Sequence, residues 1–212
     1  PEGGMYALVK GMHRLATDLG VKFSFNTDIR AINITEEGIA TSLQAGNDKF
    51  PFDSVLASAD YHHVDNDLLP PAFRTYSEHY WDSRALAPAA LVYNLGINTK
   101  LPGLAHHNVY LHSPSASFAD FSSKKPSWPE HPAMIISCSS KTDPSAAPAG
   151  CENVAVLIPV SPGLTDTPEI REHYLRYSIN VLNSLTGLDI SGNIVFSRSS
   201  AGSDHINTYH AY

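Results

Sequence analysis

The hydrophobic positions at the start of the chain repeat first at the spacing of a helix and then at the spacing of a strand. Apolar residues recur at i, i+3, i+4 and i+7 from Met5 to Leu19, and Gly20 follows them. This pattern predicts an amphipathic helix that ends at Gly20. Apolar and polar residues then alternate over 21–25, which predicts a strand.

A hairpin, a buried strand and an interrupted helix are predicted next. The alternating runs 29–34 and 39–43 flank Glu36-Glu37-Gly38, whose residues favour a turn. Residues 55–57 form a short apolar run of the kind found in buried strands. Residues 61–87 have a helical pattern that the two prolines at 70 and 71 interrupt.

Alternation returns in the second half of the chain. Leu91, Tyr93 and Leu95 fall on one face of a strand that begins near residue 89. Further strands are predicted at 109–111, 134–137, 154–160 and 194–196, and a helix is predicted at 166–186, ending at Gly187. Because the connections are too short for parallel crossovers, we expect a mostly antiparallel sheet. The predicted fold class is therefore α/β, of the mixed α+β type.

Composition excludes several classes of protein. The chain has 212 residues, of which 42% are hydrophobic and only 17% are charged, so a disordered chain is excluded. The net charge of -7 argues against a nucleic-acid partner. No apolar run approaches the roughly 18 residues of a membrane-spanning helix. Two cysteines, Cys138 and Cys151, imply no disulfide framework, and we expect a reducing, cytoplasmic setting.

Residues with catalytic or metal-binding chemistry form no recognisable motif. Eleven histidines are present, including the adjacent pairs His62-His63 and His106-His107. Adjacent residues of a strand point apart, so such pairs rarely supply two metal ligands, and no metal site is predicted. The sequence contains no GxSxG, P-loop or GxGxxG motif. No catalytic acid, base or nucleophile is assigned.

One segment has the composition of a membrane interface. Aromatic residues and lysines are mixed over eleven positions, at Phe118, Phe121, Lys124, Lys125 and Trp128. This composition predicts peripheral contact with a membrane surface. The alternative is an ordinary surface loop whose aromatic side chains turn inward.

Several short motifs, taken in order, resemble one family. They are Pro1-Glu2-Gly3-Gly4-Met5-Tyr6, Ala59-Asp60-Tyr61-His62-His63, Tyr80-Trp81-Asp82, Lys141-Thr142-Asp143-Pro144, Gly150-Cys151-Glu152-Asn153 and Leu157-Ile158-Pro159-Val160. Together they resemble the central part of bacterial-type phytoene desaturases, within the carotenoid desaturase group of the amine-oxidase-like FAD-dependent oxidoreductases. The resemblance covers almost the whole chain.

The resemblance implies a cofactor and a domain plan. Such enzymes bind FAD in a discontinuous Rossmann-like domain and carry a mostly antiparallel substrate domain with flanking helices. Residues 1–85 would then be the central portion of the FAD-binding domain, 86–190 the substrate-binding domain, and 191–212 the start of the return to the FAD-binding domain. Because the GxGxxG segment of the family is missing, we expect an internal fragment. The family pattern implies a backbone contact of Ile29 with the adenosine part of FAD; the alternative is that Ile29 is simply a core residue.

The implied substrate is a long apolar carotenoid precursor, most simply phytoene, from which a hydride passes to flavin. A hydrocarbon offers no polar group, so its site should be a tunnel of aliphatic and aromatic side chains. The candidate lining residues are Leu91, Tyr93, Leu95, Tyr110 and Met134, with core packing as the alternative for each.

Other functions remain open on the same residues. A carotenoid isomerase, a ketolase-type oxygenase or a later-step desaturase would share the scaffold. A different class is a non-catalytic module that binds an apolar ligand. The isolated chain is expected to be inactive and to retain no FAD.

Overall fold

The computed structural model describes residues 3–112 and 126–212. The chain divides into two compact units. The first unit comprises Pro1–Gly20 and Ala87–Ser203, and the second comprises Val21–Leu86 and Asp204–Tyr212. These boundaries differ from the domain plan implied by the family resemblance, which divides the chain after residues 85 and 190. Each unit is described by itself.

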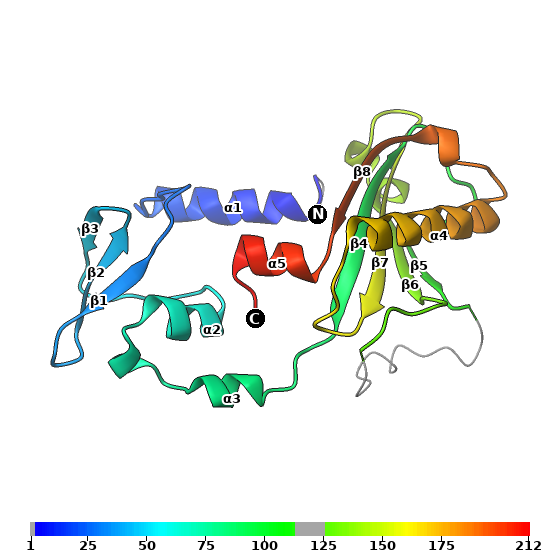
Figure 1. The fold of residues 1–212 in the computed structure, drawn as a ribbon. Helices are drawn as coiled ribbons and strands as arrows, with labels where there is room; N and C mark the ends of the chain where they lie inside the picture. Colours follow the sequence, from blue (N-terminus) through cyan, green and yellow to red (C-terminus); the bar gives the residue numbers. More distant parts are fainter. Residues whose placement is uncertain (1–2, 113–125) are drawn as a thin grey trace. The chain divides into compact units, whose positions relative to one another are not determined.

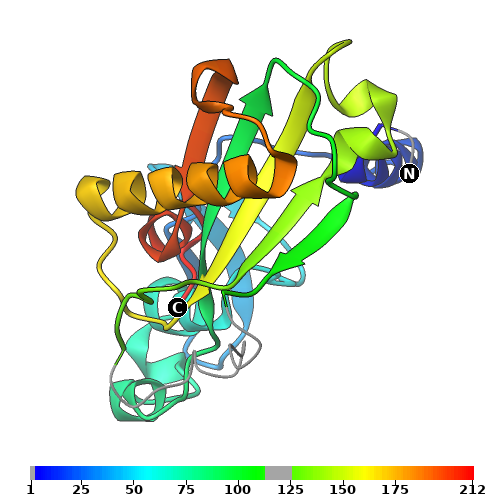
Figure 2. The ribbon, with the colours of Figure 1, turned by 90° about the vertical axis from the view of Figure 1, so that its right-hand side faces the viewer.

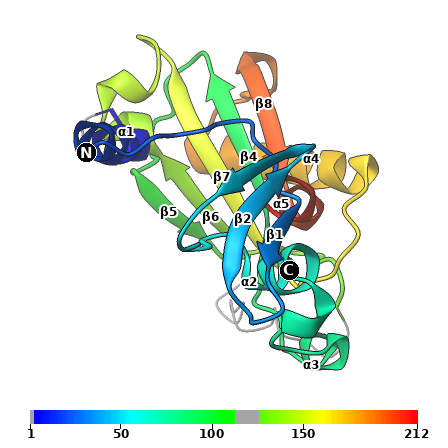
Figure 3. The ribbon, with the colours of Figure 1, turned by 90° about the vertical axis from the view of Figure 1, so that its left-hand side faces the viewer.

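The first unit is built on a five-stranded antiparallel sheet (Figures 1 and 3). Its spatial order is β5-β6-β7-β4-β8. The strands are β4 (Ala89–Ile97), β5 (His107–Tyr110), β6 (Met134–Cys138), β7 (Glu152–Val160) and β8 (Ile194–Ser200). This arrangement confirms the predicted strands of the second half and the mixed, mostly antiparallel fold class.

One long helix, α4 (Pro168–Thr186), lies across one face of this sheet (Figure 2). It begins where predicted because Thr167 caps it: the Thr167 hydroxyl accepts a hydrogen bond from the N–H of Ile170 at 3.4 Å. It ends because Gly187 takes the left-handed conformation, with φ of 69°. Short 3₁₀ turns join the strands: η4 (Ser139–Lys141), η5 (Pro144–Ala146) and η6 (Ser191–Asn193).

The first helix, α1 (Met5–Asp18), matches its prediction but buries none of its residues within the described structure. Its apolar stripe is exposed, and the large side chains of Met5, Leu8, Val9, Met12 and Leu15 are each more than half accessible. The helix is therefore amphipathic in sequence, and its apolar face is available to a further partner.

The second unit contains a three-stranded meander followed by short helices. The meander is β1 (Ala31–Ile34), β2 (Ala40–Ala45) and β3 (Asp48–Pro51), which confirms the predicted hairpin. The helices are α2 (Tyr61–His63), a π-turn η1 (Val64–Leu68), a 3₁₀ turn η2 (Pro71–Phe73), α3 (Glu78–Asp82) and α5 (Gly202–Tyr209), which begins in the first unit.

Two local predictions were wrong in this unit, and a third was confirmed. Residues 21–25 form no strand in the described structure, although the rings of Phe23 and Phe25 stack 5.9 Å apart. Residues 55–57 form no strand, and Leu56 is 97% exposed. A β-strand is defined by its pairing with a neighbouring strand, and neither sheet of the described residues includes these two segments. The interrupted helical pattern predicted at 61–87 is confirmed: the segment forms short helical elements, with a break at Pro70-Pro71 and a new start where Ser77 caps α3.

Candidate functional site

The two faces of the five-stranded sheet have different surroundings. On β4, alternate residues from Leu91 to Ile97 face α4 and are at most 2% exposed. They form the hydrophobic core together with Tyr174, Val181 and Leu182 of α4. The intervening residues of each strand lie on the opposite face, to which the core cluster contributes no side chain. We call this second surface the open face of the sheet.

All five candidate lining residues lie on the covered face. Leu91, Tyr93, Leu95 and Met134 are buried in the core, and Tyr110 packs against its edge. The Tyr93 hydroxyl donates a hydrogen bond to the Arg171 carbonyl of α4 at 2.5 Å, and desolvation raises the pKa of Tyr93 well above its ordinary value. Their observed role is packing, and their contact with a substrate stays a prediction.

An apolar row crosses the open face. Val109 pairs with Ile135, Ile135 with Leu157, and Leu157 with Val92, so the four side chains lie side by side on neighbouring strands. With strands spaced roughly 4.8 Å apart, the row extends over about 14 Å. Val109 and Ile135 are 63% and 38% exposed, and the other two are half-buried. The apolar row is thus an elongated hydrophobic surface.

A polar row runs beside it, two residues along each strand. Pairing aligns His107, Ser137, Ala155, Asn94 and Arg198 in that order. The His107 ring nitrogen Nδ1 hydrogen-bonds with the Ser137 hydroxyl at 3.0 Å. The side chains of Asn94 and Arg198 are exposed and make no hydrogen bond or ion pair with the described residues. Hydrogen-bonding groups are therefore available immediately next to a hydrophobic surface.

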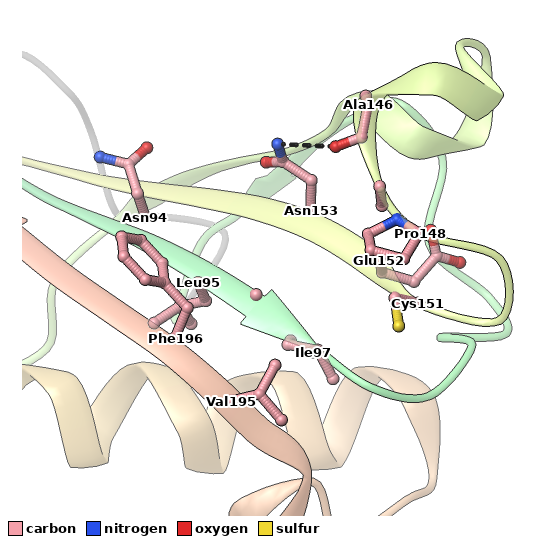
Figure 4. A pocket seen from close by; sticks show the side chains of 12 residues that line it. Asn94, Leu95, Ile97, Ala146, Pro148, Cys151, Glu152, Asn153, Val195 and Phe196 are labelled. Carbon is pink, nitrogen blue, oxygen red and sulfur yellow. Dashed lines mark hydrogen bonds between the residues drawn. The ribbon is translucent and has the colours of Figure 1, made fainter.

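A cavity of about 310 Å³ lies next to Asn94 of the polar row (Figure 4). Its lining includes Asn94, Gly96, Pro148, Asn153, Val195 and Phe196, and we call it the Gly96 pocket. A Cβ on Gly96 would lie 3.1 Å from the Phe196 Cβ, so glycine permits the close approach of the aromatic residue. The Asn153 carboxamide donates a hydrogen bond to the Ala146 carbonyl at 3.2 Å. The Asn94 carboxamide makes no hydrogen bond with the described residues.

A buried ionic cluster supports one wall of this pocket. The carboxylate of Glu152 is 1% exposed and receives hydrogen bonds from Lys141 Nζ at 2.7 Å and from the Ser140 hydroxyl. Burial opposes ionisation of Glu152, but these hydrogen bonds and the charge of Lys141 outweigh burial and lower its pKa to about 2. The nearby Cys138 thiol is buried, and desolvation raises its pKa. The cluster is fully paired and therefore structural rather than reactive.

Ile29 immediately precedes Arg30 and β1, and its side chain is half-buried in the second unit. Its backbone N–H and carbonyl make no hydrogen bond within the described residues. They are free to meet a ligand, so this position fits a backbone contact with a nucleotide, which stays a prediction. Within residues 3–112 and 126–212, no three potential ligands gather into a metal site.

The predicted membrane segment falls largely outside the described residues. Phe118, Phe121, Lys124 and Lys125 belong to the part that the structure does not describe. Trp128 is described, and it turns inward: its ring lies 5.2 Å from that of Tyr174, and its Nε1–H donates to the Thr165 carbonyl at 3.1 Å. In the part of the chain that is described, no helix has the length and apolar character to cross a bilayer.

Comparison with known proteins identifies relatives along the whole chain. A carotenoid 3,4-desaturase from Haloarcula japonica is 35% identical over 211 residues, which is 100% of this chain and 42% of that protein. The chain is a homologue of the carotenoid desaturases. A second relative is the zeta-carotene-forming phytoene desaturase of Myxococcus xanthus. It is 30% identical to this chain over 162 residues, which cover 76% of this chain and 30% of that protein. No protein-family model matches the chain.

The carotenoid desaturase homologue spans less than half the length of either relative. Among solved structures, an oxidoreductase from Methanosarcina mazei matches 94% of the chain and 42% of its own length, with a TM-score of 0.62 and 16% identity. At that identity the match shows a shared fold. The sequence motifs therefore named the correct group of proteins, and the structure confirms the mixed α/β fold.

The open face is the feature that sequence reasoning missed. On β4, the residues Ala90, Val92, Asn94 and Gly96 alternate with a more apolar set that includes the predicted lining residues Leu91, Tyr93 and Leu95. A signal was present, because the long amphipathic helix at 166–186 must cover the more apolar face of the sheet. The less apolar face, with its exposed Asn94 and its glycine, was then the one that this helix leaves uncovered.

Proposed function

We propose that the protein is an FAD-dependent desaturase of a C40 carotenoid, with phytoene as the substrate expected from its sequence. The observation that carries the proposal is the apolar row on the open face, found in a homologue of desaturases whose substrates are long hydrocarbons. We place the carotenoid along this row, in the first unit, and the nucleotide contact at Ile29, in the second.

The apolar row suits a substrate without polar groups. Such a molecule binds by removing apolar surface from water, which contributes roughly 25 cal/mol for each Å² of apolar surface covered. Because Val92 and Leu157 lie on central strands, their positions are fixed by pairing on both sides. A rigid row holds a straight polyene in one orientation and excludes water from it.

The chemistry of hydrogen removal belongs to the cofactor. When bound, FAD supplies the hydride acceptor, since desaturation takes a hydride and a proton from neighbouring carbons. The residues of this chain bind the hydrocarbon, orient it and keep water away. The Glu152 carboxylate is already paired with Lys141 behind the pocket wall, and we assign it no proton transfer.

A second candidate reaction acts closer to the end of the carotenoid. The relative from Haloarcula japonica is named as a 3,4-desaturase, and it aligns with the whole chain, whereas the phytoene desaturase aligns with 76%. Positions 3 and 4 are counted from the chain end. The Gly96 pocket lies beside the row at a place where such an end could be held.

The proposal is tested with the complete gene product, loaded with FAD and given phytoene in liposomes. Desaturation lengthens the conjugated system, so the product absorbs at longer wavelength and elutes separately. We expect this shift, with one equivalent of flavin bound. If the flavin-bound protein only isomerises or oxygenates the carotenoid, desaturation is the wrong reaction for this protein. If the protein shows neither bound flavin nor turnover, the result favours an apolar-ligand-binding module.

We also propose that the protein meets its substrate at a membrane surface, because a C40 hydrocarbon resides in lipid. The segment of Phe121, Lys124 and Lys125 supports this by composition. Phe121→Ser is expected to weaken co-sedimentation with liposomes of anionic lipid. Trp128→Ser is not an equivalent test, because Trp128 packs on Tyr174. Unchanged sedimentation of the Phe121 variant would exclude this surface.

A further inference from the structure

A second cavity of the first unit, of about 1220 Å³, includes His107 of the polar row in its wall. The wall brings together segments that are remote in sequence, and we call the cavity the histidine pocket; its lining includes Gly4, Tyr6, His106, Asp143 and Asn153. We propose that His107 accepts the proton that desaturation removes from the carotenoid. This inference rests on the proposed function and adds a catalytic residue to it.

The first argument is the place of His107 beside the apolar row. His107 and Val109 are two residues apart on β5, so their side chains share the open face at a spacing of roughly 7 Å. Val109 is the first member of the apolar row, and His107 is an exposed residue. A polyene that lies along the apolar row therefore passes beside the His107 imidazole.

The second argument is the chemistry of the polar row. The Ser137 hydroxyl and the Asn94 carboxamide do not take up a proton near neutral pH, and the Arg198 guanidinium already carries one. An imidazole is the side chain that most readily accepts and releases a proton in this range. Of the five residues of the polar row, His107 is therefore the one suited to be a base.

The carboxylate of the pocket wall is less suited to accept the proton. One oxygen of Asp143 accepts hydrogen bonds from the Ser145 N–H at 2.9 Å and from its hydroxyl at 2.6 Å, and the other oxygen is buried. The hydrogen bonds from Ser145, and to a lesser extent the backbone N–H groups of Gly3 and Gly4, lower the pKa of Asp143. Asp143 instead places a negative charge on the wall that faces the proton acceptor, where it stabilises the positive charge of an imidazolium.

The third argument is the way in which the His107 ring is held. Its Nδ1 hydrogen-bonds with the Ser137 hydroxyl at 3.0 Å. When Nδ1–H is the donor of this bond, Nε2 carries the free lone pair, and Nε2 makes no hydrogen bond with the described residues. The ring of His106 lies beside it, with centroids 4.3 Å apart, and His106 is itself fixed by a hydrogen bond of its Nδ1 with the Thr142 hydroxyl at 2.5 Å.

The proton and the electrons of the step are accounted for as follows. Desaturation breaks two C–H bonds on neighbouring carbons. One hydrogen leaves with its electron pair as a hydride and reduces the flavin cofactor. The electron pair of the second C–H bond forms the new C=C bond, and its proton forms an N–H bond at His107 Nε2. The imidazolium then returns the proton to water, to which the exposed side chain has access.

The test uses the complete FAD-loaded enzyme and phytoene in liposomes. His107→Gln keeps a hydrogen-bonding side chain but cannot take up the proton, so the rate of a single turnover should fall about a hundredfold or more, with flavin content unchanged. His107→Ala should lose the same activity and recover part of it when imidazole is added, because the free base occupies the place of the missing ring. The matched control is His173→Gln, an exposed histidine of α4, which should leave the rate unchanged.

A second measurement does not depend on turnover. In the enzyme with reduced flavin, bound carotenoid should slow the modification of His107 by diethyl pyrocarbonate severalfold, as followed by peptide mass spectrometry, and should leave His173 as reactive as before. Undiminished turnover in His107→Gln, a loss in His107→Ala that imidazole does not relieve, or equal modification of His107 with and without carotenoid would overturn the inference while leaving desaturation intact. If the unaltered enzyme desaturates no carotenoid, the proposed function fails together with this inference.

Discussion

Lys141 and Glu152 form an ion pair, 2.7 Å from nitrogen to oxygen, at the point where η4 meets the first residue of β7. The carboxylate is almost completely buried, and Lys141 also donates to the Leu101 carbonyl at 2.7 Å. The pair therefore ties together three segments that are remote in sequence and that lie behind the Gly96 pocket.

Removing the lysine should destabilise the protein strongly. Lys141→Met leaves the buried carboxylate without its main partner, and such losses cost about 3–5 kcal/mol. Lys100→Met is the matched control, because the Lys100 amine is 3.7 Å from Glu152 and its side chain is 60% exposed. Its loss should cost at most about 1 kcal/mol. Urea denaturation followed by circular dichroism measures both losses, and a loss for Lys141→Met as small as the one expected for Lys100→Met would contradict the importance of the pair.

The same carboxylate predicts how stability depends on pH. The pKa of Glu152 is lowered from 4.5 to about 2 in the folded protein. A group whose pKa is lowered on folding stabilises the protein above its unfolded pKa, and this contribution is lost as the pH falls. The free energy of unfolding should therefore decrease between about pH 4.5 and pH 2. In Glu152→Gln this decrease should become smaller, and an identical pH profile would contradict the assignment.

The two cysteines should react at different rates. Cys138 is buried and its pKa is raised by desolvation, so it carries little thiolate at neutral pH. Cys151 is only half-buried, at the rim of the Gly96 pocket. We expect one fast-reacting thiol in the native protein and two after unfolding, measured with a thiol-specific chromogenic reagent. In Cys151→Ser the fast reaction should disappear; its persistence would place Cys138 at the surface.

Predictions from the sequence succeeded where a local pattern and its neighbours agree. The strand β4 (Ala89–Ile97) and the helix ending at Gly187 follow from alternation and capping chemistry, which the surrounding structure reinforces. The strand expected at 21–25 has the same alternation, but pairing requires a second chain segment, and neither sheet of the described residues includes this segment. Periodicity states which residues share a face and does not state what covers that face.

The candidate site shows the same limit. Tyr93 and Leu95 were correctly placed on one face of a strand, but α4 fills the space above them. Asn94, Gly96 and Phe196 come together only through the pairing of β4 with β8, which joins residues about a hundred positions apart. Register between distant strands cannot be inferred from one sequence, so the pocket became visible only in the structure.

The central claim is that the open face of the sheet binds the hydrocarbon. It is tested most directly by Leu157→Asn, which places an amide in the middle of the apolar row, in the complete FAD-loaded enzyme. Leu185→Asn is the control, an exposed leucine of α4 outside the row. We expect Leu157→Asn to raise KM for the carotenoid about tenfold or more, with flavin content unchanged, and Leu185→Asn to leave KM unaltered. An unchanged KM in the Leu157 variant would contradict the account.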